Sequence, residues 1–129
     1  MRSPRNPIRT IVVDDSPAAL RAICLVVARQ PNLAFVGAAM NGREALALAR
    51  SLQPDLVLLD LQMPIMGGIE ATSRLEQECP TARIVIVTVH DTPQLRKLCY
   101  ERGASGFIVK DALHEELPIV VRELFGNGN

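Results

Sequence analysis

The sequence predicts an α/β fold in which a doubly wound parallel sheet carries helices on both faces. Short apolar runs alternate with helix-like stretches along the whole of the 129 residues, which is the order expected of parallel strands joined by crossover helices. The apolar runs also lack the polar–apolar alternation of half-exposed strands, as is typical of strands buried on both faces. The length is that of one domain.

Five strands and five helices follow from these patterns. Three helices show apolar residues at the i, i+3, i+4, i+7 spacing of one helix face, and two more fill the remaining gaps. Ser16-Pro17 and Thr92-Pro93 are typical helix starts, and Gly103 is typical of a position just past a helix end. The strands are predicted near residues 9–14, 33–38, 55–60, 83–89 and 106–109. The helical faces are Leu20, Ile23, Cys24 and Val27; Ala45, Leu48, Ala49 and Leu52; and Leu117, Val120, Val121 and Leu124; the other two helices lie in Ile69–Glu78 and Pro93–Arg102, and residues 126–129 form a tail or the start of a linker.

The composition narrows the class of protein. Fourteen basic and fourteen acidic residues give no net charge, which argues against nucleic-acid binding by this domain alone. The three cysteines have wide, unrelated spacings, so neither a zinc site nor a disulfide framework is expected, and a reduced, cytoplasmic protein is the simplest interpretation. The basic N-terminal segment is not followed by a long apolar run, so we expect no signal peptide and no membrane span.

Polar residues follow four of the five predicted strands where the chain leaves the sheet. Asp14 and Asp15 follow the first strand, Asp60 follows the third, Thr88 lies near the end of the fourth, and Lys110 follows the fifth. Ligands bind beyond the carboxyl ends of the strands in such sheets, so we expect these side chains to meet there. Each residue alone has an ordinary explanation, as a turn former, a strand residue or a surface charge. Together, three carboxylates with room for water predict an Mg²⁺ site, with the lysine compensating further charge.

The sequence lacks the motifs that two common classes of reaction require. No histidine–carboxylate pair stands beside a serine or cysteine, so acyl transfer through a triad is unsupported. No GxxxxGK[ST] or GxGxxG segment occurs, so a nucleotide-phosphate cradle is unsupported as well. A carboxylate beside a metal, an ammonium and a hydroxyl suits phosphoryl transfer, in which positive groups offset the charge on the phosphoryl oxygens.

Four stretches resemble the receiver domain of bacterial two-component response regulators: "IVVDDS", "DLVLLDLQMPIMGGIE", "IVIVTVHD" and "GASGFIVKDA". The resemblance covers nearly the whole chain and implies one CheY-like receiver domain over residues 1–129, with a flavodoxin-like sheet of strand order 2-1-3-4-5. The last stretch, followed by "EEL", is similar to the NarL/LuxR-like subgroup. Members of that subgroup usually continue into a helix-turn-helix DNA-binding domain, which would lie outside this chain.

The resemblance implies a phosphorylatable switch whose partner is a sensor histidine kinase. Asp60 would be the phosphoacceptor. Asp15 would bind Mg²⁺ directly and Asp14 through water, while Asp60 and the backbone carbonyl of Gln62 would complete the protein ligands. Such a domain catalyses its own phosphorylation and dephosphorylation but is not an enzyme acting on an outside substrate.

The resemblance also implies how the phosphoryl group is held and read out. Thr88 and Lys110 would hold it, and Phe107 takes the place of the aromatic switch residue. The output surface would be the fourth helix, fifth strand and fifth helix, through which a homodimer is possible. Gln62 and His90 are expected to border the path of the hydrolytic water and so set the lifetime of the phosphate.

Three departures from the family pattern carry structural expectations. Asp111 follows Lys110 where many receivers have a proline after a cis bond; a cis bond before a non-proline residue costs about 3 kcal/mol, so we expect trans. Gly67 replaces the usual aspartate before Gly68, which predicts a helix start without a side-chain cap. Pro118 lies inside the last predicted helix, so that helix is expected either to begin late or to bend.

Two alternatives from other classes stay open. An aspartyl-nucleophile phosphohydrolase would use similar groups, but such enzymes usually show DxD after the first strand, and here Asp14 and Asp15 are adjacent. A stand-alone receiver that acts by protein binding alone, without phosphorylation, is the other alternative, and the presence of Asp60, Thr88 and Lys110 argues against it.

Overall fold

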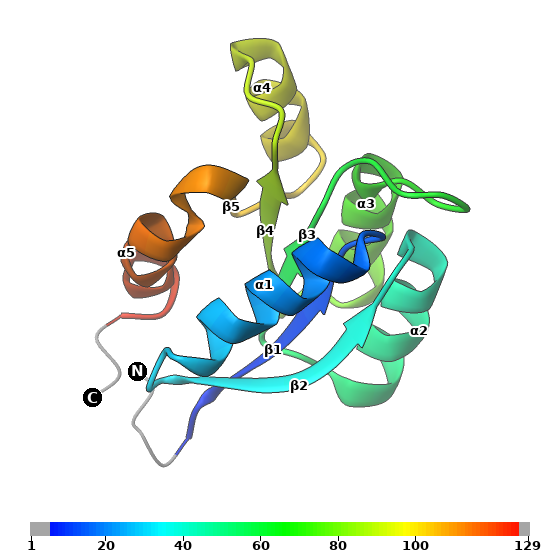
Figure 1. Cartoon of the computed structure of the whole chain (residues 1–129). Coiled ribbons are helices and arrows are strands. Elements are labelled where there is room, and N and C mark those ends of the chain that lie inside the picture. The colour runs from blue at the N-terminus through cyan, green and yellow to red at the C-terminus, as the bar shows by residue number, and fades with distance from the viewer. Residues whose placement is uncertain (1–5, 127–129) are drawn as a thin grey trace.

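The computed structural model describes residues 6–126. It shows a five-stranded parallel sheet in the order β2-β1-β3-β4-β5, with helices on both faces (Figure 1). The predicted fold class and strand order are therefore confirmed. Of the tail expected at residues 126–129, only Gly126 lies within the described residues. The strands are β1 (Ile8–Val13), β2 (Leu33–Ala39), β3 (Leu56–Leu59), β4 (Arg83–Thr88) and β5 (Gly106–Val109).

The helices begin and end where local capping residues allow. The Ser16 hydroxyl accepts a hydrogen bond from the Ala19 amide at the start of the first helix, and the Thr92 hydroxyl accepts one from Leu95 at the start of the fourth. Gly103, with a φ of +115°, follows the fourth helix in a conformation that favours glycine. The helices are α1 (Pro17–Ala28), α2 (Gly42–Leu52), α3 (Gly68–Glu78), α4 (Pro93–Glu101) and α5 (Leu113–Phe125), and the short 3₁₀ helix η1 (Lys110–Ala112) precedes the last.

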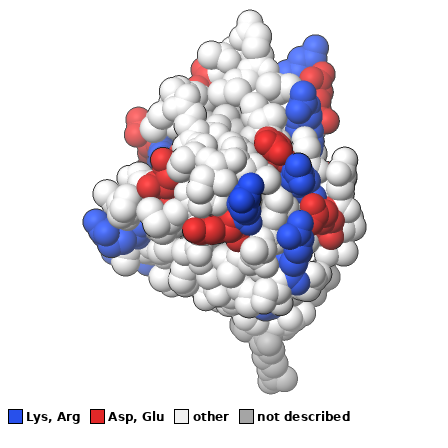
Figure 2. Space-filling model, turned by 90° about the vertical axis from the view of Figure 1, so that its right-hand side faces the viewer, with Lys and Arg blue, Asp and Glu red and all other residues white. Residues whose placement is uncertain are grey.

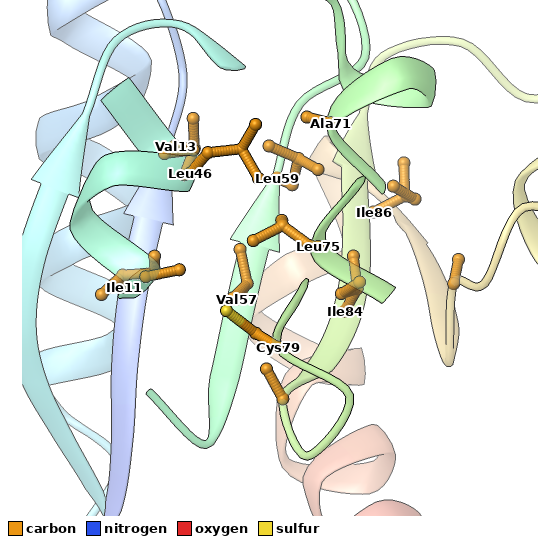
Figure 3. Close-up of a cluster of buried hydrophobic side chains, with 14 of the residues drawn as sticks. Ile11, Val13, Leu46, Val57, Leu59, Ala71, Leu75, Cys79, Ile84 and Ile86 are labelled. Atoms are coloured by element: carbon orange, nitrogen blue, oxygen red, sulfur yellow. The ribbon is translucent and has the colours of Figure 1, made fainter. Parts of the chain in front are cut away.

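The sheet separates two apolar layers. Alternate residues of the central strands point to opposite faces, as the period of a strand requires: Ile11 and Val57 pack under α2 and α3 (Figure 3), whereas Val12 and Leu58 pack under α1 and α5. Both faces of β1 and β3 are therefore covered, which explains why β3 is apolar throughout and β1 is apolar from Ile11 to Val13.

Pro118 does not delay the start of α5, so that one of the two expected alternatives is wrong. The helix begins at Leu113 and continues through Pro118 to Phe125. Leu113 and Leu117 are buried against the sheet, and this packing outweighs the loss of one backbone hydrogen bond at the proline.

The face formed by α2 and α3 carries both signs of charge close together (Figure 2). Arg50 and Glu78 approach to 2.6 Å between Nη2 and Oε1, and Arg74 and Glu70 pair at 3.2 Å within α3. Such exposed pairs contribute little stability. They do cancel each other's field, so this face presents no strong potential of one sign to a partner.

Within residues 6–126 no helix is both long and apolar enough to cross a membrane.

Gly68 is placed where any larger residue would strike the backbone of the strand end. A Cβ at this position would lie 2.2 Å from the Asp60 carbonyl oxygen and 2.6 Å from Leu61 Cα. We therefore expect Gly68→Ala to lower the free energy of unfolding by about 1–3 kcal/mol, the usual cost of overpacking, as measured by urea denaturation. Gly67→Ser is the control, because its Cβ would meet nothing closer than 3.4 Å and serine is a favoured N-cap residue. An equal loss in both variants would contradict the steric explanation.

Candidate functional site

The first carboxylate of the site lies at the end of β1. Asp14 is fully buried, and its backbone amide donates to the Ala39 carbonyl, which extends the pairing with β2 beyond the last strand residue. Its Oδ1 accepts a hydrogen bond of 2.9 Å from the Ser16 amide. Asp15, the next residue, is exposed. The two adjacent aspartates are therefore in different environments, one fixed beneath the surface and one facing solvent.

The second strand end brings Asp60 beside Asp14. The Asp60 amide donates to the Val13 carbonyl at 3.0 Å, so the chain leaves β3 next to the point where it leaves β1. Asp60 is 8% exposed, and its Oδ1 accepts from the Leu61 amide at 2.8 Å. Its other oxygen, Oδ2, faces Lys110.

Lys110 places one ammonium between two carboxylates. Its Nζ lies 2.7 Å from Asp14 Oδ2 and 3.5 Å from Asp60 Oδ2. Burial alone would lower the pKa of Lys110, but the contacts with Asp14 and Asp60 outweigh it and hold this pKa above its ordinary value. Burial and the nearby charge of Asp14 raise the pKa of Asp60, and the Leu61 amide and Lys110 offset only part of that increase. The site is therefore short of positive charge.

The donor set fits a hard divalent cation. Carboxylate oxygens of Asp14, Asp15 and Asp60 all lie within 4.8 Å of one another, and one lysine faces this group of three. Asp14 Oδ2 is buried, and its one partner among the described residues is the Lys110 ammonium at 2.7 Å. A buried carboxylate oxygen with no donor beyond one ammonium suits a metal ligand or its water. The residues therefore fit Mg²⁺.

Thr88 and Phe107 lie on the next two strands toward the edge. Thr88 ends β4 and is fully buried, and its Oγ1 accepts a long hydrogen bond of 3.3 Å from the His90 amide. Phe107, on β5, is 4% exposed and belongs to the core layer under α2, α3 and α4. The His90 side chain is exposed.

The loop after Asp60 is held in an uncommon backbone conformation. Ile65 has a φ of +70°, a region that β-branched residues rarely adopt. The Gly68 amide donates to the Leu61 carbonyl across this loop, and Gln62 is exposed at its beginning. As expected from Gly67, no side chain caps α3. The peptide bond after Lys110 is trans, also as expected, since no cis bond occurs within residues 6–126.

A contact that the sequence does not predict covers Phe107. The Arg96 guanidinium lies 4.7 Å from the centroid of the Phe107 ring, a cation–π arrangement. Arg96 is itself held by Asp91 through Nε–Oδ1 and Nη2–Oδ2 contacts of 2.7 and 3.3 Å, and hydrogen bonding to Arg96 lowers the pKa of Asp91. Only the juxtaposition of α4 and β5 shows this contact, because nothing in the spacing of Arg96 and Phe107 predicts it.

Comparison with known proteins identifies the family to which this fold belongs. Residues 10–122 match the family described as the response regulator receiver domain. The chain belongs to this family. This receiver domain is 35% identical to the nitrate/nitrite response regulator NarL of Escherichia coli K12, over 89% of the chain and 53% of that protein.

Solved structures agree as well. A two-component response regulator of the LuxR family from Aurantimonas is 35% identical, with a TM-score of 0.86 over 92% of this chain and 84% of that one. A CheX–CheY–BeF₃–Mg complex from Borrelia burgdorferi matches at 26% identity and a TM-score of 0.86, over 95% and 98% of the two chains. The receiver domain spans about half the length of the curated relatives that it matches, which are named as NarL and the response regulator GacA.

The raised pKa of Asp60 implies that the free energy of unfolding depends on pH. A carboxyl group whose pKa is higher in the folded than in the unfolded protein weakens folding as pH rises above its ordinary value near 3.8. In EDTA at pH 7, Asp60→Asn should therefore have a higher free energy of unfolding than wild type. The gain should shrink as pH falls and vanish below about pH 4. Asp111→Asn, which alters an exposed carboxylate on the neighbouring 3₁₀ helix, is the control. Urea denaturation from pH 3.5 to 8 measures both, and equal stability of wild type and Asp60→Asn at pH 7 would contradict the charge imbalance.

Proposed function

We propose that this receiver domain is a phosphorylatable switch in which Asp60 accepts a phosphoryl group from a sensor histidine kinase in the presence of Mg²⁺. The observation that carries the proposal is the position of Lys110, whose Nζ lies 2.7 Å from Asp14 and 3.5 Å from Asp60 at a site with three carboxylates. Asp60 is the carboxylate among these that ends the central strand, is nearly buried, and still presents an oxygen toward the lysine.

In the proposed reaction a carboxylate oxygen of Asp60 attacks the phosphorus of a phosphohistidine. The phosphorus–nitrogen bond breaks, and the imidazole nitrogen leaves with the electron pair. Lys110 is placed to bind a phosphoryl oxygen, and Asp14 and Asp15 with the carbonyl of Gln62 are the proposed metal ligands beside Asp60. Bound Mg²⁺ would offset negative charge on the phosphoryl oxygens. Hydrolysis would return Asp60 to its free form, with Gln62 and His90 bordering the path of the water.

The proposed readout starts at Thr88. A phosphoryl oxygen would attract the Thr88 hydroxyl as a hydrogen-bond donor. Thr88 already accepts from the His90 amide, so its movement would pull on the loop that contains Asp91. Asp91 holds Arg96 over Phe107. The chain of contacts therefore joins the phosphorylation site to the surface of α4, β5 and α5, through which we propose a homodimer.

Several features support a regulatory role beyond this chain. The relatives are named as response regulators and are about twice as long as the match, so we propose that the switch controls an effector domain that binds DNA and regulates transcription. We propose a cytoplasmic location on the evidence of Cys24, Cys79 and Cys99, all free thiols.

Phosphorylation of Asp60 is the direct test. Incubation with acetyl phosphate and Mg²⁺ should add one phosphate to the wild type by intact mass, whereas Asp60→Asn should gain none. Asp15→Ala should need a much higher Mg²⁺ concentration, because it removes a proposed ligand. The exposed Asp111→Asn should behave as wild type. Labelling of Asp60→Asn to the wild-type extent would refute the assignment. Steady turnover of p-nitrophenyl phosphate would instead identify a phosphohydrolase.

The readout through Arg96 can be tested by sedimentation velocity. Beryllofluoride and Mg²⁺ should tighten self-association of the wild type but not of Thr88→Ala. Arg96→Ala should reduce the gain about fivefold, the equivalent of the ~1 kcal/mol expected of an exposed cation–π contact. Lys97→Ala is the control, since it removes a neighbouring exposed cation. If Arg96→Ala and Lys97→Ala associate as the wild type does, Arg96 does not transmit the change.

A further inference from the structure

The turn between β2 and α2, residues 39–42, contacts both of the loops that carry the proposed metal ligands, and we call it the β2–α2 corner. On one side, the Ala39 carbonyl accepts a hydrogen bond of 3.1 Å from the Asp14 amide. On the other side, the Gly42 amide donates at 2.9 Å to the Met66 carbonyl, in the green loop of Figure 1 that joins β3 to α3. The corner supplies none of the three clustered carboxylates. It therefore bridges the two loops without contributing a ligand of its own.

The loop between β3 and α3 contains a strained three-residue turn. The Met66 amide donates to the Pro64 carbonyl at 2.7 Å, and Ile65 between them has a φ of +70°. Turns of this kind are costly, above all for a β-branched residue. Ile65 is 68% exposed, so burial of its side chain does not offset the cost. Other contacts must hold the turn, and the hydrogen bond from Gly42 reaches the residue directly after Ile65.

Glycine at position 42 is required by the loop and not by the helix. A Cβ at Gly42 would lie 2.4 Å from the Met66 carbonyl oxygen and 2.8 Å from Met66 Cβ. Gly42 is the first residue of α2 and does not have a positive φ, so glycine gives the helix no conformational advantage there. Its amide is also one of the first amides of a helix, which have no partner within the helix. Donation to Met66 therefore costs the helix nothing.

The β2–α2 corner is itself firmly held. Asn41 is 7% exposed, and its Oδ1 accepts a hydrogen bond of 2.9 Å from the Glu44 amide. The Glu44 carboxylate in turn accepts one of 3.0 Å from the Met40 amide. The two bonds fix the path by which the chain enters α2, so the Gly42 amide has a defined position relative to the end of β2.

We propose that the β2–α2 corner is a positioning element of the metal site, in which Gly42 holds the loop after Asp60 in the conformation that presents the Gln62 carbonyl as a ligand. The inference rests on the proposed function, because only there is the Gln62 carbonyl a ligand. Gly42 acts through the loop, in the way that groups outside the ligand set orient metal ligands. Since Mg²⁺ tolerates little deviation from octahedral geometry, a displaced loop lowers the affinity for the ion.

The first test is a titration of Mg²⁺ into the whole chain by isothermal calorimetry. Gly42→Ala should weaken Mg²⁺ binding about tenfold, as is typical for the loss of a group that orients a ligand. Gly37→Ala is the matched control, because its Cβ would press against the Leu48 and Leu52 side chains at 3.1 Å, near the other end of α2. It adds the same methyl group without touching the loop, and should keep the wild-type affinity.

A second pair of variants loosens the corner without a steric clash. Asn41→Ala removes the side chain that caps α2 and should also weaken Mg²⁺ binding. Asn41→Ser keeps a favoured cap residue and should bind Mg²⁺ more tightly than Asn41→Ala does. Neither substitution alters a proposed ligand, so a difference between them reports the position of the loop.

Amide hydrogen exchange measures the same contact without the metal. In EDTA, the Met66 amide should exchange about fivefold faster in Gly42→Ala than in the wild type, as the loss of one hydrogen bond predicts. Gly37→Ala should exchange at this amide as the wild type does.

The outcomes separate this inference from the proposed function. Equal Mg²⁺ affinity of wild type and Gly42→Ala, equal weakening by Gly37→Ala, equal affinity of the two Asn41 variants, or unchanged exchange of the Met66 amide would overturn the inference and leave the proposed function standing. A wild type that binds no Mg²⁺ would instead refute the proposed metal site, and the inference with it.

Discussion

The organisation of this receiver domain depends on a shortage of positive charge at the ends of β1 and β3. Asp14 and Asp60 are forced together because the two strands are paired in the middle of the sheet, and the Asp60 amide donates to the carbonyl of Val13. Lys110 contacts both carboxylates, yet the pKa of Asp60 stays raised. A bound cation, or the charge added by the proposed phosphorylation, would therefore interact strongly with these carboxylates, since burial lowers the local dielectric constant.

The packing of the sheet offsets the free-energy cost of holding these carboxylates close together. The core strands are apolar on both faces and covered by helices on both sides, so the backbone that carries Asp14 and Asp60 has little freedom to separate them. Gly68 lets the loop after Asp60 fold back against the strand end without a steric clash. The cost of burying two carboxylates is thus offset by packing elsewhere, and the same packing keeps the charged groups in place for the proposed chemistry.

One series of contacts leads away from this centre. Toward β5, the Thr88 hydroxyl accepts from the His90 amide, and the neighbouring Asp91 holds Arg96 over the Phe107 ring. These contacts are individually weak and partly exposed, as would suit the proposed readout. In the proposed readout this surface reports the state of the site.

The sequence by itself determined the fold class, the segments that form strands and helices, and the residues at the strand ends. The periods of apolar residues are local properties, and the topology of parallel sheets brings Asp14, Asp15, Asp60 and Lys110 to one edge. The sequence left open whether Pro118 delays or bends α5, and the packing of Leu113 and Leu117 decided against delay. The sequence did not show that the Arg96 guanidinium lies over the Phe107 ring, or that Leu25 and Phe35 are both exposed. These features join residues from different elements, so they depend on how helices lie against strands, which only the tertiary structure decided.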